Sequence, residues 1–285
     1  MLIKKKLTAL FLAVVMCMTM SAPALATTAT FESPYTSDRE MGYEEIVNYL
    51  LVEAGNTAVS PAWSSGTIAD DGSYLTHGFI TETALDVLTS KLSAADTFFT
   101  ARCMNQLKLG SVKPDFDEND NTFAWHFYGP NGLNIIFGTT TAYSKFIEHY
   151  NNAVDRYEEG NNTAIWDSML ILGRALHYLQ DLKVPHHASN AAAYVTNHLD
   201  FERLAEENME SFAISSITSS DLVTIARQSL GTTADNSTEH ARDWYPDASS
   251  VVESQNMDAI EATLERAQKD TAGILYKFMI DVGVI

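Results

Sequence analysis

Two histidine–acid pairs within one short window constrain this chain more than any other feature of its sequence. His177 precedes Asp181 by four residues, and His198 precedes Glu202 by the same spacing. Residues four apart on a helix lie one turn from each other on the same face, so each pair presents an imidazole and a carboxylate together, as a metal site requires. One such pair is usually an ordinary surface pair. Two pairs so close together favour a metal site built on helices.

Other potential ligands surround these pairs. Pro185 is expected to end the first helix and to turn the chain so that His187 faces the same cavity. Upstream, His77 and a loop that carries Asp115 and His126 add two more imidazoles and a carboxylate. These additions strengthen the metal hypothesis.

Apolar residues elsewhere recur with helical spacing, and few stretches alternate as strands do. The sequence therefore predicts an all-α fold, a single compact multi-helix domain without an internal repeat or a Ser/Gly-rich linker. Two segments rich in Asp, Asn, Pro and Gly, residues 107–138 and 231–250, are expected to be long loops. The predicted helices cover residues 43–53, 82–92, 142–157, 164–178 and 257–282.

Composition excludes several classes of protein. With 46% hydrophobic residues the chain can form a packed core, which separates it from disordered proteins. A formal charge of -19 repels phosphate backbones and anionic headgroups. We therefore expect no nucleic-acid partner and no general electrostatic attraction to anionic membranes.

The first 26 residues have the pattern of a secretory signal peptide: a basic start at Lys4–Lys6, an apolar run at 7–20 and a small-residue cleavage site at 22–26. The alternative is a membrane anchor, but the apolar run is shorter than the ~20 residues that a spanning helix needs. We expect a secreted, extracellular protein without a stable anchor. Removal of the signal leaves Cys103 as the last cysteine, so no intrachain disulfide is expected.

Residues 27–62 are polar and acidic, and a segment of this size is not expected to bury much apolar surface. The segment ends at Ser60-Pro-Ala62, directly before Trp63. The small Ala62 suits a peptidase, and the proline favours an extended, accessible backbone.

Three motifs carry a resemblance to a known family, and they extend over the chain from Trp63 to about Val284. The sequence resembles the bacterial zinc-dependent phospholipase C family, which includes the bacillary phosphatidylcholine-preferring enzyme and the catalytic domain of clostridial alpha-toxin. The motifs are His177-Tyr-Leu-Gln-Asp181 with Pro185-His186-His187-Ala-Ser-Asn190, the loop 109–117 with His126-Phe-Tyr-Gly-Pro, and residues 267–282.

The resemblance implies an all-helical domain with three zinc ions in a cleft. Carried over position by position, it assigns the ligands in three sets. They are Asp115, His126, His177 and Asp181 for one zinc; His187, His198 and Glu202 for a second; and Trp63, His77 and again Asp181, as a bridge, for the third. His186 occupies a position that the family does not use for metal.

Trp63 can act as such a ligand only if it is the N-terminus, because a free amino nitrogen and its carbonyl oxygen chelate a cation whereas an internal amide does not. The resemblance thus implies that residues 27–62 are a propeptide, that cleavage of the Ala62–Trp63 bond activates a zymogen, and that residues 63–285 are the catalytic domain. No C-terminal lipid-binding β-sandwich is expected, because the sequence stops at Ile285.

The implied activity is hydrolysis of phosphatidylcholine-like lipids by zinc-activated water, giving diacylglycerol and a phosphorylated headgroup. The enzyme is expected to act as a monomer at a membrane or micelle surface. Asp115 is both a ligand and a possible general base. Phe116 and Phe123 lie where the family presents aromatic rings to the headgroup, where a cation–π contact is reasonable, although they could equally be hydrophobic anchors of their loop.

The sequence departs from the family at two places, and two rival functions stay open. No acidic residue follows Trp63 where the bacillary enzyme meets choline, which leaves the headgroup preference in doubt, and Gln180 replaces a customary glycine. One rival is the family of single-strand-specific zinc nucleases, and the other is a non-catalytic secreted zinc- or lipid-binding protein.

Overall fold

The computed structural model describes residues 32–53, 73–117, 123–129, 140–191 and 196–285. Within them every regular element is a helix, so the all-α prediction is confirmed. The α-helices are α2 (Tyr43–Glu53), α3 (Ser73–Lys91), α4 (Ser93–Phe98), α5 (Ala101–Asp117), α7 (Ala142–Tyr157), α8 (Asn162–Asp181), α9 (Pro185–Ala188), α10 (His198–Asn208), α11 (Ser219–Ala226), α12 (Leu230–Asp243), α13 (Tyr245–Ala248) and α14 (Glu253–Asp281), and the 3₁₀ helices are η1 (Phe123–His126) and η3 (Met209–Phe212).

Helix α7 matches its predicted bounds because its first turn is capped. The Thr141 hydroxyl accepts from the backbone N–H of Ser144 at 3.2 Å, and the Ser144 hydroxyl accepts from the N–H of Thr141 at 2.9 Å. This reciprocal pair satisfies two N–H groups that have no partner within the helix. Helix α8 begins in a related way, with the side chain of Asn161 accepting from the N–H of Ala164.

The prediction of long loops is wrong for residues 107–117 and for most of 231–250, whereas 118–122 and 130–138 lie outside the described residues. Residues 101–117 form α5 although Pro114 lies inside it, and residues 230–248 form α12 and α13. The physical reason is tertiary packing, which overrides weak helix propensity. Apolar residues of α5 such as Leu107 and Leu109 are fully buried, and small residues of α12 such as Ala234 and Ala241 fit within the interior.

Helices α5 and α8 meet at a pair of glycines. A Cβ atom added to Gly110 would lie 2.2 Å from the carbonyl oxygen of Leu170, and one added to Gly173 would lie 2.3 Å from that of Leu107. Only residues without a side chain allow two helix backbones to approach so closely. This contact fixes the spacing of the two helices that later carry three candidate ligands.

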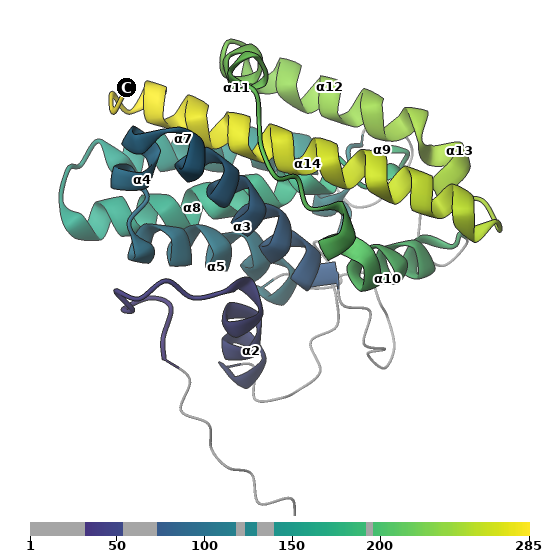
Figure 1. Cartoon of the computed structure of the whole chain (residues 1–285), viewed down its shortest axis with the longest axis horizontal. Helices are drawn as coiled ribbons and strands as arrows, with labels where there is room; N and C mark the ends of the chain where they lie inside the picture. The colour runs from purple at the N-terminus through teal and green to yellow at the C-terminus, as the bar shows by residue number, and fades with distance from the viewer. Residues whose placement is uncertain (1–31, 54–72, 118–122, 130–139, 192–195) are drawn as a thin grey trace, which may run out of the picture. The chain divides into compact units, whose positions relative to one another are not determined.

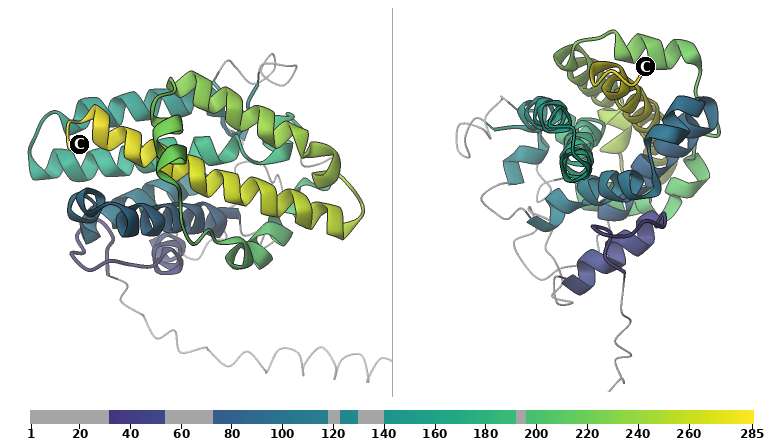
Figure 2. Two further views of the ribbon diagram at one scale, coloured as in Figure 1. Left: turned by 45° about the horizontal axis from the view of Figure 1, so that its top comes forward. Right: turned by 90° about the vertical axis from the view of Figure 1, so that its left-hand side faces the viewer.

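Helix α14 connects two apolar clusters. Its C-terminal half contributes Ile274, Leu275 and Phe278 to the larger cluster, which includes buried residues of α3, α7 and α8. Its N-terminal half contributes Ile260 and Leu264 to a second cluster with α3 and α10. Helix α14 packs against α3, and α12 lies alongside α14 in Figures 1 and 2.

The segment before residue 54 does bury apolar surface, contrary to the prediction. Met41, Ile46, Val47 and Leu50 are at most 2% exposed and form a third cluster with α5. The prediction failed because a short amphipathic helix can bury one face completely when a neighbouring helix offers a complementary surface. Helix α2 therefore packs as part of the unit Ser33–Ile285.

Among the described residues, no helix combines the length and the apolar character needed to cross a membrane. The predicted signal peptide, the Ala62–Trp63 bond and Trp63 itself lie outside the described residues.

Candidate metal centre

Eight candidate ligands come together from six helices. All eight residues are buried, none more than 7% exposed. They are His77 on α3, Asp115 on α5, His126 on η1, His177 and Asp181 on α8, His187 on α9, and His198 and Glu202 on α10. The structure thus brings together every predicted ligand that lies within its described part, in three groups whose potential ligand atoms lie within 4.8 Å of one another.

The first group consists of Asp115, His126 and His177, and Asp181 lies beside its two imidazoles. His177 Nε2 lies 3.1 Å from His126 Nδ1 and 3.5 Å from Asp115 Oδ1. Asp181 Oδ2 lies 3.0 Å from His126 Nδ1 and 3.2 Å from His177 Nε2. His126 Nδ1 and Asp115 Oδ1 are 3.9 Å apart. Two imidazoles and two carboxylates therefore converge from α5, η1 and α8.

These distances fit a zinc ion. Donors about 2.0–2.2 Å from a tetrahedral zinc ion lie roughly 3.3–3.6 Å from one another, and the separations that involve the imidazole nitrogens of His126 and His177 run from 3.0 to 3.9 Å. Nitrogen and carboxylate oxygen are also donors that zinc favours. The first group fits zinc in both its chemistry and its size.

The second group is built mainly on α10. His198 Nε2 lies 3.0 Å from Glu202 Oε1, one turn along the helix, and His187 Nε2 lies 3.5 Å from the same oxygen.

The prediction that Pro185 ends the helix of His177 is wrong. Helix α8 ends at Asp181, four residues before Pro185, and Pro185 is the first residue of α9. The first position of a helix suits a residue without an N–H.

The third group joins His77 to His177 and Asp181. His77 Nε2 lies 3.7 Å from Asp181 Oδ1 and 4.0 Å from Asp115 Oδ2. The same Asp181 Oδ1 accepts from His187 Nδ1 at 3.1 Å. Asp181 therefore contacts all three groups, whereas its spacing in the sequence indicated only a partnership with His177.

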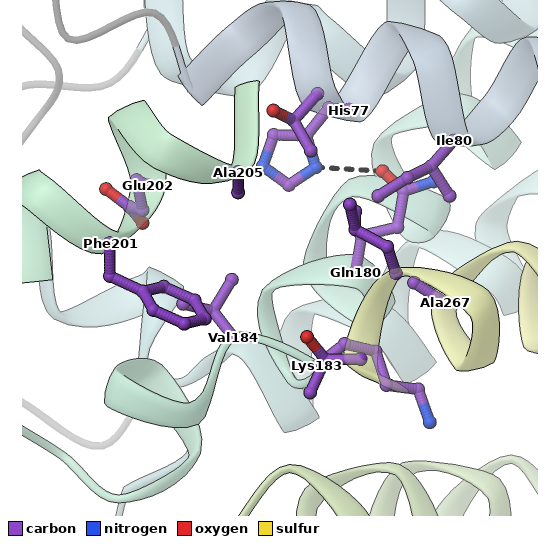
Figure 3. Close-up of a pocket in the computed structure, with 12 residues that line it drawn as sticks. His77, Ile80, Gln180, Lys183, Val184, Phe201, Glu202, Ala205 and Ala267 are labelled. Atoms are coloured by element: carbon purple, nitrogen blue, oxygen red, sulfur yellow. Dashed lines mark hydrogen bonds between the residues drawn. The ribbon is translucent and has the colours of Figure 1, made fainter. Parts of the chain in front are cut away.

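Hydrogen bonds to the second ring nitrogen orient two of the imidazoles, and the sequence analysis did not predict these bonds. His177 Nδ1 donates to the carbonyl oxygen of Ser111 at 2.9 Å, and His77 Nδ1 donates to Gln180 Oε1 at 2.8 Å (Figure 3). Each bond leaves Nε2 directed at the other ligands, as metal-binding histidines require. No sequence signal marks a backbone carbonyl, but Gln180 stood out as a departure from the family.

Burial and charge set the protonation of the centre. Burial alone would raise the pKa of Asp181, but His177 and His126 outweigh it and hold that pKa well below its usual range. Burial opposes protonation of His177, yet Asp115 and Asp181 raise its pKa. Burial lowers the pKa of His77 to about 3, with His177 adding to the effect. The neutral imidazole of His77 and the ionised carboxylate of Asp181 are therefore in the forms that ligate metals.

A pocket borders the centre on one side. His77 and Glu202, from two different groups, line it together with Gln180 (Figure 3). Most of the remaining wall is apolar and comes from α3, α10 and α14, including Ile80 and Leu264. The second and third groups therefore share access to one cavity.

The structure places the remaining predicted site residues as follows. Phe116 is half-buried and packs against the cluster formed by α2 and α5. Phe123 begins η1, three residues before His126, but its side chain is outside the described part. His186 belongs to none of the three groups: its Nε2 lies 3.1 Å from Asn197 Oδ1, and its ring stacks on that of His198.

The curated proteins with similar sequences described next are each called phospholipase C. The chain is 28% identical over 239 residues to a phospholipase C of Paraclostridium bifermentans, covering 73% of this chain and 59% of that protein. It is 29% identical over 262 residues to a phospholipase C of Clostridium perfringens, covering 81% and 64%. A phospholipase C of Bacillus cereus is 27% identical over 139 residues, 46% of this chain and 48% of that protein. The chain spans about six-tenths of the length of the first two.

Solved structures support the fold. Alpha-toxin from Clostridium absonum matches with a TM-score of 0.64 at 22% identity, covering 73% of this chain and 64% of that chain. Alpha-toxin from an avian strain of Clostridium perfringens matches with a TM-score of 0.62 at 24% identity, covering 73% and 63%. At this identity the likeness concerns the fold alone.

A family model described as zinc-dependent phospholipase C matches residues 76–276, a range that contains all eight of the described candidate ligands. This range is well over half of the chain. The chain is therefore a member of the zinc-dependent phospholipase C family.

Proposed function

We propose that this protein is a secreted zinc phosphodiesterase that hydrolyses phospholipids, phosphatidylcholine-like lipids in particular, to diacylglycerol and a phosphorylated headgroup. The observation that carries the proposal is the first group, in which the imidazoles of His126 and His177 lie within 3.9 Å of each other and of carboxylate oxygens of Asp115 and Asp181, close enough to share one zinc ion. Membership of the family supports the metal and the substrate class.

The three groups support a centre of three zinc ions, with Asp181 shared between the first and the third and Trp63 completing the third. Zinc bound here would lower the pKa of water and stabilise negative charge on the phosphate. Asp115 presents Oδ1 to His126 and His177, and its Oδ2 lies 4.0 Å from His77 Nε2. In this position Oδ2 would accept the proton of the attacking water, while buried Glu202 and His198 hold the far side of the centre.

Processing would complete this centre. We propose that residues 1–26 are a signal peptide, that residues 27–62 are a propeptide, and that a cut at Ala62–Trp63 creates the amino group that chelates the third zinc. The residue pattern of the N-terminus supports the signal. The third group supports the chelate, because His177 and Asp181 also serve the first zinc, which leaves His77 as the one ligand that the third group does not share.

Gln180 would act as a positioning residue for the third zinc. Its amide accepts from His77 Nδ1 and donates to Thr81 Oγ1 at 3.0 Å and Thr271 Oγ1 at 3.4 Å. These three bonds, which reach α3 and α14, fix the amide and hence the ring of His77. Figure 3 shows the side chain of Gln180 extended toward the imidazole.

We expect Gln180→Ala to weaken binding of one zinc ion by about 10–100-fold, because the His77 ring loses its fixed tautomer and orientation. Gln180→Glu keeps an acceptor at the same place and should retain most of the affinity. Titration of the processed protein with a zinc-selective chelator measures both. Equal losses in the two variants would mean that Gln180 only fills space.

The proposed activity predicts release of phosphocholine from phosphatidylcholine micelles, inhibited by a chelator and restored by zinc. Asp115→Asn should lower turnover by at least about 100-fold while leaving the melting temperature nearly unchanged, because the amide keeps the size of the buried side chain. Single-stranded DNA is the comparison substrate. Nucleotide release without phosphocholine release would identify a nuclease, and zinc binding without either product would identify a non-catalytic protein.

A further inference from the structure

We propose that the segment Ser33–Glu53 is a permanent part of the folded enzyme, which stays bound to α3 and α5 as a separate peptide after the chain is cut before Trp63. This inference rests on the proposed cut. It makes the mature protein a complex of two chains, in which the partner of the α3–α5 surface is the enzyme's own N-terminal segment.

Apolar packing joins the segment to the body. Ile46 and Leu50, on one face of α2, are 0% and 2% exposed, and Met41 just before the helix is 0% exposed. They share a cluster with Leu109 and Val112 of α5, which are also fully buried. Departure of the segment would expose both halves of this cluster to water, and burial of such side chains is the main force that holds helices together.

The stretch before α2 is held through its backbone. Asn105 Oδ1 accepts from the N–H of Met41 at 2.8 Å, and Asn105 Nδ2 donates to the carbonyl of Arg39 at 2.7 Å. Gln106 Nε2 donates to the carbonyl of Pro34 at 2.9 Å. Both α5 side chains are at most 3% exposed. Polar groups buried so deeply on a surface helix are matched to a chain that remains in place.

The segment also provides a carboxylate that neutralises a buried positive charge of the body. Lys108 of α5 has no exposed side-chain surface, and its ammonium lies 3.2 Å from Glu40 and 3.5 Å from Glu82. Glu40 belongs to the segment and Glu82 to α3. Release of the segment would remove the carboxylate of Glu40 and would expose Lys108 and Glu82 to solvent. This loss is unfavourable because a buried ammonium needs its counter-charges.

The body lacks a side chain where the segment approaches most closely. A Cβ added to Gly78 of α3 would lie 2.9 Å from the Cβ of Tyr43 and 3.3 Å from Val112. The N–H of Tyr43 donates to Glu82 Oε2 at 2.7 Å. Gly78 directly follows His77, so the start of α2 packs beside one of the candidate ligands.

The test uses the full chain with a specific protease site whose cut falls directly before Trp63. After cutting, we expect the N-terminal peptide to co-elute with the body in size-exclusion chromatography and to appear as a one-to-one complex in native mass spectrometry. The melting temperature should not fall more than about 2 °C below that of the uncut protein. A peptide that elutes alone from a body of unchanged melting temperature would overturn the proposal.

Matched variants sharpen the test. Ile46→Ala combined with Leu50→Ala should raise the dissociation constant of the cut complex by at least about 100-fold. Val52→Ala on the same helix, where Val52 is 46% exposed, should leave it unchanged. Equal effects of both changes would contradict the docking surface.

Zinc content and turnover, measured on the same samples before and after cutting, separate this inference from the one on which it rests. If cutting changes neither quantity, the role of Trp63 as a ligand fails while retention of the peptide is still decided by co-elution. If zinc content rises but the peptide leaves a body of unchanged stability, only the docking proposal fails.

Discussion

Asp181→Asn is expected to remove most of the bound zinc and to lower phospholipase activity by at least about 100-fold. Loss of a residue that only supports a metal ligand already costs up to about 100-fold, and Asp181 is proposed to be a ligand itself. The carboxylate of Asp181 lies 3.0 Å from a nitrogen of His126, 3.2 Å from one of His177 and 3.1 Å from one of His187. Asparagine is neutral, and its amide offers one acceptor where Asp181 uses two. All three ligand groups would lose a shared anion.

The measurement is metal analysis of the purified variant together with phosphocholine release. Asp167→Asn is the matched control, because Asp167 lies on the same helix, α8, with its side chain 48% exposed. It should keep full zinc content and turnover. An Asp181→Asn protein with a full complement of zinc and normal turnover would contradict the proposed centre.

Gly173→Ala is expected to destabilise the protein by more than the ~1–3 kcal/mol typical of an overpacked core, and to impair catalysis as well. The added Cβ would lie 2.3 Å from the carbonyl oxygen of Leu107, about 1 Å inside ordinary contact. The obstacle is backbone, so α5 and α8 would have to separate. The bond from His177 to the carbonyl of Ser111 joins these helices, and a ligand displaced by about 1 Å can lower rates by about 100-fold.

Thermal unfolding and kinetics check this expectation. Helix propensity alone favours alanine over glycine by about 1 kcal/mol, so a loss of stability must come from the clash. Gly42→Ala is the control, since nothing lies within 4 Å of a Cβ at Gly42. If the Gly173→Ala protein melted at the temperature of the Gly42→Ala protein, the close helix contact would not be essential.

Spacing along the sequence predicted the local parts of the site well. The pairs His177–Asp181 and His198–Glu202 each lie on one helix, so the i, i+4 rule alone brings their atoms within 3.2 Å and 3.0 Å. A contact such as His177 to Ser111 joins residues far apart in the chain, and no local pattern encodes it. Asp115, His126 and His77 were therefore only potential further ligands, and their assignment to particular zinc ions depended on the family resemblance.

Glycine and proline explain where the fold prediction failed. Gly110 and Pro114 indicate a loop when they are considered locally. In the structure Gly110 is the point where α5 touches α8, and Pro114 is tolerated inside the helix because its neighbours are firmly packed. The meaning of Gly110 depends on Gly173, a residue of another helix. Likewise, the burial of α2 could not be predicted from its own sequence, because it depends on the apolar surface of α5.

Helix α14 ties the folding of the two apolar clusters into a single cooperative event. Its two halves belong to different clusters, and between them the buried carboxylate of Asp270 pairs with Lys183, just beyond α8, and with Arg266. Neither cluster can open while the other keeps α14 in place. The amide protons in the middle of this helix should therefore exchange with solvent only when the whole unit unfolds, so their exchange rate reports the global stability of the protein.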